Sequence, residues 1–258
     1  MYLGCDPEIF LTDSAGALVS AVGKIGGTKQ APRPLPIGDG FAVQEDNVAI
    51  EFNIPPADSQ ALFVHNIQEC RNYLAGMVAE QGLKFINSSA EYFPIQELMT
   101  QAAQEFGCDP DFNAWTGRRN PRPKAIDETL RSAGGHVHVG YYFDHPKKVL
   151  DFTKYLDLYL AVPSVLMDAG ELRKQLYGKA GAFRHKPYGM EYRVLSNYWI
   201  FDNKLISWVW SQVHNAMEAW QAGVVDMEQE GSIIISTINN NNRDQAESLI
   251  SKYHLNLT

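Results

Sequence analysis

The pattern of polar and apolar residues along the chain predicts four strands whose polar faces are rich in acids and imidazoles. Alternation with a period of two is typical of a β-strand, because successive side chains point to opposite faces of the sheet. The alternating segments are 1–11, 47–54, 134–141 and 189–197. In each of them one face is apolar and suited to a core, so the other face is available for function.

The first two of these segments place carboxylates on one face. In 1–11, Asp6 and Glu8 share a face, and the residues between and beside them are apolar or proline. In 47–54, Glu51 lies on the polar face, and Glu45 has the same parity if the strand begins early. We therefore expect all four acids to point away from the core.

The other two segments add imidazoles and an arginine. In 134-GGHVHVGY-141, His136 and His138 alternate with valines, and glycines flank them. In the last segment Glu191 and Arg193 alternate with apolar residues. Each side chain taken alone fits a solvated strand face, so the argument depends on the four strands being neighbours.

Helical periodicity and turn residues fill the remainder of the chain. Helices are expected over 58–81 with Asp58 as the N-cap, from 146 to about 167, over 202–224, and in two short C-terminal segments, the last capped from 239-NNNN-242. Long loops rich in glycine, proline or basic residues are expected over 24–40, 108–128 and 169–187. Because strands and helices are interspersed without a linker or repeat, we expect one domain over 1–258, with a core of about 1–224 and a helical tail over 225–258, of α+β or α/β class with a single sheet.

Composition narrows the functional class. The 258 residues carry a net charge of −8, which argues against broad binding to nucleic acid or anionic lipid. The N-terminus does not resemble a signal peptide, and no apolar run approaches the length of a membrane span. Cys5, Cys70 and Cys108 are odd in number and scattered, which favours a reducing cytoplasm. We expect a cytoplasmic protein.

The polar strand faces together predict a divalent-metal site. They offer five carboxylates, two imidazoles and no lysine: Asp6, Glu8, Glu45, Glu51, Glu191, His136 and His138. Like charges on neighbouring strands repel each other unless cations lie between them. Sites rich in oxygen ligands suit Mg²⁺ or Mn²⁺, with an imidazole as a minority ligand.

Basic residues are concentrated in two of the loops that lead into these strands. The loop over 169–187 contains Arg173, Lys174, Lys179, Arg184 and Lys186, and the loop over 108–128 contains Arg118, Arg119, Arg122 and Lys124. Against the negative net charge, this concentration suggests a clamp for a polyphosphate or a carboxylate. The chain has no P-loop and no GxGxxG fingerprint, so a bound nucleotide would be held by metals and arginines.

These motifs resemble a family of known proteins. The order of an acid-x-acid strand, an acidic strand, GGHVHVG and a basic loop ending in EYR is similar to the glutamine-synthetase-like carboxylate–amine ligases. The strings 44-QEDNVAIEFNIPPA-57, 131-RSAGGHVHVGY-141 and 177-YGKAGAFRHKPYGMEYRVLSNYW-199 most resemble the phage phiEco32-like COOH–NH2 ligase type 2 amidoligases. The resemblance covers about residues 1–210. It implies an α+β fold, a single domain with a curved, mostly antiparallel sheet and helices on its outer face.

The resemblance also implies roles for individual residues. The implied metal ligands are Asp6, Glu8, Glu45, Glu51, His136 and Glu191. The implied nucleotide contacts are His138, Arg184, Lys186, Lys179 and Arg193. Arg193, Arg184 and Glu51 are the residues implied to act in catalysis.

The implied activity is the joining of a carboxylate to an amine, with ATP and Mg²⁺, or Mn²⁺, as cofactors. ATP would phosphorylate the carboxylate to an acyl phosphate, which an amine would then attack. The expected partners are small-molecule or peptide carboxylates and amines, and the sequence does not identify them. Two alternatives stay open: a Zn²⁺ or Fe²⁺ hydrolase or oxygenase that uses His136, His138 and a carboxylate, and a non-catalytic phage protein that retains the fold.

Overall fold

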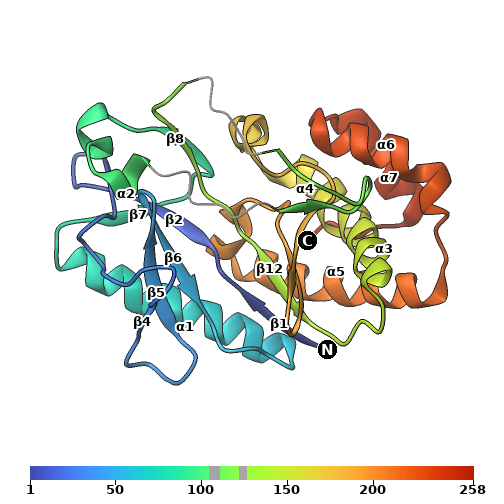
Figure 1. Ribbon diagram of the computed structural model, residues 1–258, viewed down its shortest axis with the longest axis horizontal. Coiled ribbons are helices and arrows are strands. Elements are labelled where there is room, and N and C mark those ends of the chain that lie inside the picture. Colours follow the sequence, from blue (N-terminus) through green and yellow to red (C-terminus); the bar gives the residue numbers. More distant parts are fainter. Residues whose placement is uncertain (105–110, 122–126) are drawn as a thin grey trace.

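The computed structural model describes residues 1–104, 111–121 and 127–258, and these form antiparallel sheets with helices packed against them (Figure 1). Cys108, Arg122 and Lys124 lie outside the described residues. The helices share one large core with the apolar faces of the strands, in which Leu3, Ile9 and Phe52 are fully buried. The polar faces are therefore turned away from this core.

The first sheet contains the N-terminal strand and the histidine strand. Its order is β1 (Tyr2–Cys5), β12 (Val137–Gly140), β14 (Gly189–Tyr192), β13 (Ala182–Lys186), β9 (Phe112–Asn113) and β10 (Arg118–Arg119). Every neighbouring pair is antiparallel. In this register His138 lies between Gly4 and Glu191, and Glu191 lies opposite Arg184. Residues far apart in the sequence therefore meet on one face of this sheet.

The second sheet continues from the first through the segment Asp6-Pro7. Its order is β3 (Leu18–Val19), β2 (Glu8–Thr12), β6 (Ala49–Asn53), β5 (Ala42–Asp46) and β4 (Arg33–Pro34), and β7 (Lys84–Ile86) also pairs with β2. The Glu8 N–H donates to the Gly134 carbonyl over 2.9 Å, so the strand beside β12 continues past the end of β1. Pro7 has no N–H to donate, which separates β1 from β2 while the chain stays extended. A small additional sheet pairs β8 (Ala90–Tyr92) with β11 (Leu130–Ser132).

The helices follow the predicted apolar periodicity closely. They are α1 (Gln60–Ala79), α2 (Gln101–Gln104), α3 (Pro146–Leu156), a π-helical turn (Asp157–Ala161), α4 (Val162–Met167), α5 (Asn203–Ala222), α6 (Met227–Asn239) and α7 (Arg243–Tyr253), with 3₁₀ turns at Ile95–Leu98, Glu171–Gln175 and Asn197–Phe201. In α1 the buried residues Phe63, Ile67, Leu74 and Val78 recur at helical spacing and form its core face. The N-cap of α1 is Ser59, whose hydroxyl accepts the Leu62 N–H, so the prediction of Asp58 was wrong by one residue.

Two local predictions are corrected by the sheets. The segment 47–54 is one arm of a hairpin, because β5 precedes β6 and the turn between them places Asn47 at φ 57°. The predicted loop over 169–187 contains β13, so Arg184 and Lys186 lie on a strand. Both changes decide which side chains share a face.

The predicted α+β class, with a curved, mostly antiparallel sheet and helices on its outer face, is confirmed. At the C-terminus α7 packs against α4 and α6, and Asn242 of the predicted NNNN run caps α7. Within residues 1–104, 111–121 and 127–258, no helix combines the length and apolarity that a membrane crossing needs.

Candidate active site

Two groups of buried and partly buried acids lie on the polar faces where the two sheets meet. The first group is Asp6, His136 and Glu191, and the second is Glu8, Asp46 and Glu51. In each group one ligand atom from every residue lies within 4.8 Å of the others. This spacing is compatible with one cation in each group.

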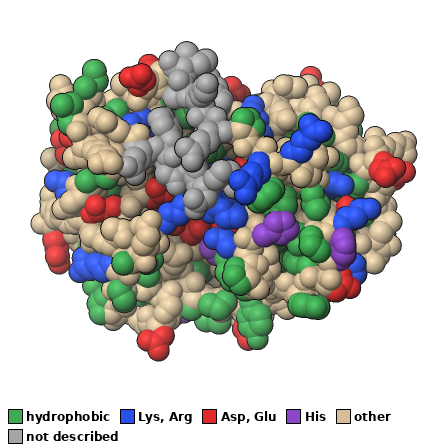
Figure 2. Space-filling model, in the orientation of Figure 1, with side chains coloured by type: hydrophobic (Ala, Val, Ile, Leu, Met, Phe, Trp, Pro, Cys, Tyr) green, Lys and Arg blue, Asp and Glu red, His purple; other side chains and the backbone are tan. Residues whose placement is uncertain are grey.

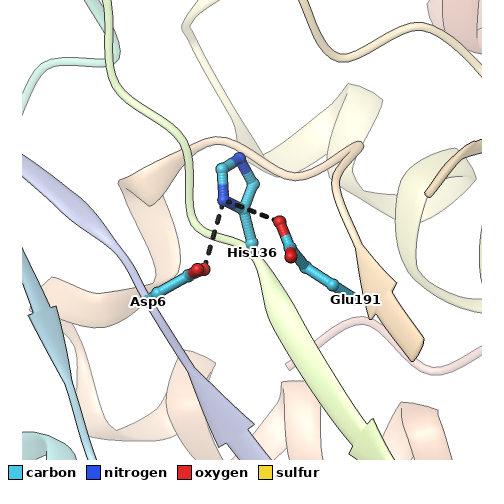
Figure 3. A group of neighbouring side chains, drawn as sticks. All are labelled: Asp6, His136 and Glu191. Atoms are coloured by element: carbon cyan, nitrogen blue, oxygen red, sulfur yellow. Dashed lines mark hydrogen bonds and ion pairs between the residues drawn. The ribbon is translucent and has the colours of Figure 1, made fainter. Parts of the chain in front are cut away.

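The first group draws one residue from each of three adjacent chain segments (Figure 3). Asp6 comes from the β1–β2 connection, His136 from the residue before β12, and Glu191 from β14. The His136 Nδ1 atom lies 3.2 Å from the Asp6 Oδ1 atom and 3.7 Å from the Glu191 Oε1 atom. The three side chains therefore converge on a point between the strands.

Close packing explains why the two residues before His136 are glycines. A Cβ atom on Gly134 would lie 2.4 Å from the Nε2 atom of His136, and one on Gly135 would lie 2.3 Å from the Ser196 carbonyl oxygen. Both distances are too short for a side chain to fit without movement. Gly134 therefore leaves room for the His136 ring, and Gly135 lets the backbone pack closely against Ser196 and Trp199.

The second group joins β2 to the β5–β6 hairpin. Glu8 and Glu51 are direct cross-strand partners, and Asp46 ends β5. The Gly134 N–H donates to the Glu8 Oε2 atom over 2.7 Å, and the Gln44 Nε2 atom donates to the Glu51 Oε1 atom over 2.8 Å. The positions of both glutamates are thus fixed by neutral donors.

Burial and mutual repulsion dominate the electrostatics of the second group. Burial, followed by the nearby Asp46 carboxylate, raises the pKa of Glu8 to about 7. Burial and the surrounding acids also hold the pKa of Glu51 well above its usual value. A divalent cation would relieve both effects, because it offsets the charge that burial and repulsion make unfavourable.

Glu191 has the opposite environment because three cationic side chains surround it. Lys186 Nζ lies 2.7 Å and Arg184 Nη1 lies 3.3 Å from the Glu191 Oε2 atom, and Arg193 contacts the Oε1 atom. Burial and Asp6 would raise the pKa of Glu191, but Arg193 and the two histidines lower it to about 2. Glu191 is therefore ionised, and the cations beside it are held on the wall of the site.

His138 lies beside the first group and has partners of its own. Its Nε2 atom lies 3.1 Å from the Asp6 Oδ2 atom, and its Nδ1 atom lies 3.1 Å from the Tyr188 hydroxyl. Burial opposes a charge on His138, but Asp6 and Glu191 raise its pKa above the ordinary value. In contrast, burial and Arg193 lower the pKa of His136. The two imidazoles are thus electrically distinct although they lie two residues apart.

Two predicted site residues do not reach these groups. Glu45 points to the opposite face of β5, where its carboxylate accepts the N–H groups of Gly23, Ile25 and Gly26 over 2.7–3.1 Å. The expectation that Glu45 would share the face of Glu51 was wrong, because the turn at Asn47 reverses the chain between them. Lys179 donates from its Nζ atom to the Asn239 carbonyl over 3.4 Å, on the side of α6.

Asp46 and Asp111 are acids of the site that the sequence reasoning missed. The signal for Asp46 was Asn47, because asparagine tolerates the left-handed backbone conformation of a turn. A turn at Asn47 divides the segment into two short strands and places Asp46 at the end of the first one. Asp111 accepts the Asn120 amide over 2.8 Å, and its Oδ2 atom lies 3.6 Å from the Arg193 Nε atom. No alternating pattern in the sequence pointed to Asp111.

Two cavities meet at the acidic groups. The larger one, of about 1170 Å³, is lined by Asp6 and His136 of the first group, by all three acids of the second group, and by Arg184 and Lys186. The smaller one, of about 50 Å³, is lined by Asp111, Arg131 and Arg173. Glu8, Asp46, His136 and Arg193 line both cavities. Lysine and arginine side chains gather near the middle of one face of the molecule, with acidic side chains among them (Figure 2).

Comparison with known proteins gives one family match. Residues 129–228 match the model of the family described as phage phiEco32-like COOH.NH2 ligase-type 2. The matched region contains the histidine strand and β13–β14, and therefore His136, His138, Arg184, Glu191 and Arg193. No curated protein matches the chain. The resemblance inferred from the sequence motifs is confirmed over this region, and it supports an enzyme that joins a carboxylate to an amine.

Proposed function

We propose that this carboxylate–amine ligase uses ATP and divalent cations to activate its carboxylate substrate as an acyl phosphate. The observation that carries the proposal is the pair of acidic groups, Asp6–His136–Glu191 and Glu8–Asp46–Glu51, of which every residue except the fully buried Glu191 lines one cavity together with Arg184 and Lys186. A polyphosphate and its cations need this combination of carboxylates and basic side chains in one cavity.

The donor set suits Mg²⁺ or Mn²⁺. Five of the six side chains in the two groups offer carboxylate oxygens, and His136 offers the only imidazole of the two groups. Hard cations prefer oxygen ligands, and the raised pKa values of Glu8 and Glu51 fit a site built for positive charge. When bound, such cations would neutralise charge that develops on the transferred phosphoryl group.

The basic residues of the site would orient the phosphates. Arg184 and Lys186 extend from alternate positions of β13 into the large cavity, and both contact Glu191. Arg193 lies deeper, at 5% exposure, and lines both cavities. We assign Arg184 and Lys186 to the nucleotide phosphates and Arg193 to the oxygens of the transferred phosphoryl group and of the acyl phosphate.

The proposed reaction has two steps. An oxygen of the substrate carboxylate attacks the γ-phosphorus atom of ATP, the bond to the bridging oxygen breaks, and ADP leaves. The neutral amine then attacks the acyl carbon, the C–N bond forms and the acyl C–O bond breaks. Phosphate leaves with the carboxylate oxygen and takes up the proton that the nitrogen loses. A carboxylate substrate becomes electrophilic only after phosphorylation. Glu51 would hold a cation beside the transferred phosphoryl group, and Arg193 would stabilise the negative charge on the oxygens of that group.

A zinc or iron enzyme is less well supported by the geometry. Such a site would use both histidines as ligands, but in the described part of the chain only His136 belongs to an acidic group. His138 has Tyr188 at its Nδ1 atom and Asp6 near its Nε2 atom. The basic side chains around Glu191 would also have no purpose in hydrolysis or oxygen chemistry of that kind.

A binding and turnover experiment tests the proposal. Mg²⁺ together with a non-hydrolysable ATP analogue is expected to raise the melting temperature of the protein, because a ligand of the native state stabilises it. Zn²⁺ alone is expected to give no such rise. A screen of small-molecule and peptide carboxylates against amines, read by ATP consumption and by mass spectrometry of products, would then identify the substrates. No effect of Mg²⁺-nucleotide at millimolar concentration and no ATP consumption in the screen would contradict the proposal.

A further inference from the structure

The site face of the first sheet has an area without side chains at the outer part of the large cavity. On β1, β12 and β14 the positions that share the polar face with Asp6, His138 and Glu191 are occupied by Gly4, Gly140 and Gly189. All three glycines line the large cavity. They leave bare backbone on three adjacent strands, and we call this area the glycine shelf.

The register places the edges of the glycine shelf. Gly140 pairs with Tyr2 on one side and with Gly189 on the other, and Gly189 pairs with Lys186. The row across the sheet is therefore Tyr2, Gly140, Gly189 and Lys186. Tyr188, the residue before Gly189, also lines the cavity, and the Tyr2 and Tyr188 side chains are 53% and 48% exposed.

The fold requires only one of the three glycines. Gly189 has φ 148°, and a Cβ atom there would lie 2.1 Å from the Val139 carbonyl oxygen, so its identity follows from the β13–β14 turn. A Cβ atom on Gly4 would meet nothing closer than the Cβ atom of His138 at 3.7 Å, which is an ordinary contact. A Cβ atom on Gly140 would lie 3.3 Å from the Cβ atom of Tyr2, which a small shift would accommodate.

A glycine that the backbone does not require is unfavourable inside a strand, because it lowers strand propensity and has no side chain to pack. One physical reason to retain it is the close approach of a ligand to the backbone. Flat backbone flanked by two exposed tyrosines suits a planar ring, which can lie on the shelf and contact the aromatic side chains.

The distance from the shelf to the second acidic group fits a nucleotide. Gly4 and Glu8 are four residues apart on an extended segment, a separation of roughly 13 Å. This is comparable to the reach of an extended nucleoside triphosphate from its base to its terminal phosphate. On β13, Lys186 lies in the row of Gly140 and Gly189, and Arg184 lies in the row of Gly4 and Glu191. Both basic side chains contact the Glu191 carboxylate.

We propose that the glycine shelf formed by Gly4, Gly140 and Gly189, with Tyr2 and Tyr188 at its edges, binds the heterocyclic base of the nucleotide. The proposal rests on the proposed function, because it assumes that the phosphates occupy the inner part of the same cavity. The glycine shelf would bind the part of a nucleotide that a polyphosphate lacks, namely the base. The residues of the shelf belong to neither acidic group.

The test compares two probes on the full-length protein. Isothermal titration calorimetry would measure the binding of the Mg²⁺ complexes of a non-hydrolysable ATP analogue and of inorganic tripolyphosphate, which has no base. Gly4→Ala and Tyr2→Ala are expected to weaken the ATP analogue by about tenfold, the scale of one lost stacking contact, and to leave tripolyphosphate within about twofold of wild type.

Matched variants control for folding. Gly76 lies in α1 with open space where its Cβ atom would be, and Tyr92 on β8 is 50% exposed and does not line the large cavity. Gly76→Ala and Tyr92→Ala are expected to bind both probes as wild type does. Melting temperatures of all variants would establish that each one is folded. If Gly4→Ala does not fold, the comparison of the two probes on Tyr2→Ala alone tests the shelf.

The outcomes separate the shelf from the underlying function. Unchanged affinity for the ATP analogue in both shelf variants, or a parallel loss for both probes, would overturn the shelf. Wild-type binding of tripolyphosphate without tighter binding of the ATP analogue would overturn it too, while leaving the phosphate and cation sites intact. Binding of neither probe by wild type would reject the proposed function and the shelf together.

Discussion

Glu8 on β2 and Glu51 on β6 are direct cross-strand partners, and both carboxyl groups are buried where the two sheets meet. Two acids in this relationship repel each other when ionised, and burial adds to the cost. Asp46 brings a third carboxylate within 4.8 Å of them. This group is stable as a set of ionised acids only when a cation lies among them, and the first two predictions follow from that requirement.

The first prediction concerns stability and pH in the absence of divalent cations. The pKa of Glu8 is about 7 in the folded state, above its ordinary value of 4.5, so the folded protein binds this proton more tightly than the unfolded chain does. Stability from this group is therefore fully present below about pH 4.5 and is lost as the pH rises through 7, by roughly 3 kcal/mol. Urea denaturation in EDTA is expected to show a smaller loss of stability between pH 5 and about pH 8 for Glu8→Gln than for wild type. Equal pH slopes for the two proteins would contradict the assignment.

The second prediction contrasts two adjacent acids. Asp46 belongs to the second acidic group, whereas Glu45 points to the other face and accepts backbone N–H groups of the loop at residues 23–26. Asp46→Asn is expected to reduce the rise in melting temperature that Mg²⁺ produces, because an amide cannot neutralise the cation. Glu45→Gln is expected to keep the Mg²⁺ response, even if its melting temperature without metal falls. A loss of the response in Glu45→Gln alone would show that the hairpin register is misassigned.

The third prediction concerns Lys179 and Lys186, which were both expected to contact the nucleotide. Lys186 lies 2.7 Å from Glu191 and lines the large cavity, whereas Lys179 donates to the Asn239 carbonyl outside it. Lys186→Ala is expected to weaken Mg²⁺-ATP binding by about tenfold, the scale of one charge-assisted contact, and Lys179→Ala by less than about twofold. Calorimetry on both variants checks this, and equal losses would remove Lys186 from the phosphate contacts.

The fourth prediction separates catalysis from folding at Arg193. Arg193 contacts Glu191, and both side chains are almost completely buried, so removal of the guanidinium leaves a buried carboxylate with fewer partners. Arg193→Ala is therefore expected to cost about 3 kcal/mol or more of unfolding free energy. Arg193→Lys keeps the positive charge but loses the planar fork, so it is expected to fold while ATP turnover falls by about 100-fold.

A matched pair of measurements decides the role of Arg193. If Arg193→Lys folds with a melting temperature near that of wild type and turns over ATP at the wild-type rate, Arg193 is a structural partner of Glu191 only. Loss of turnover with the fold retained supports its place at the transferred phosphoryl group.

Much of the site followed from alternation along single strands. Asp6, Glu8, Glu51 and Glu191 each lie on the polar face that the period of two indicated, since one face of each strand had to enter the core. The resemblance to amidoligases supplied what alternation does not contain, namely that these separate faces come together. The α+β class with an antiparallel sheet was also predictable from it.

The errors had three separate causes, and the first was a single residue that changed the direction of the chain. Asn47 at φ 57° turned a predicted single strand into a hairpin, which moved Glu45 off the site and brought Asp46 into it. β13 was predicted as a loop because its residues 182-AFRHK-186 are basic and flanked by glycines. Asp111 could not be found because its place depends on tertiary packing beside Arg193 rather than on a local pattern.

The central claim is that the chain joins a carboxylate to an amine through an acyl phosphate. Its most direct test is the transfer of ¹⁸O to phosphate from a carboxylate that carries ¹⁸O at both oxygens, read by mass spectrometry, during turnover with ATP, Mg²⁺ and an amine. We predict one labelled oxygen in each phosphate released, because the carboxylate oxygen leaves with the phosphoryl group. Release of unlabelled phosphate during product formation, or no ATP turnover with any carboxylate and amine in the screen, would contradict the claim.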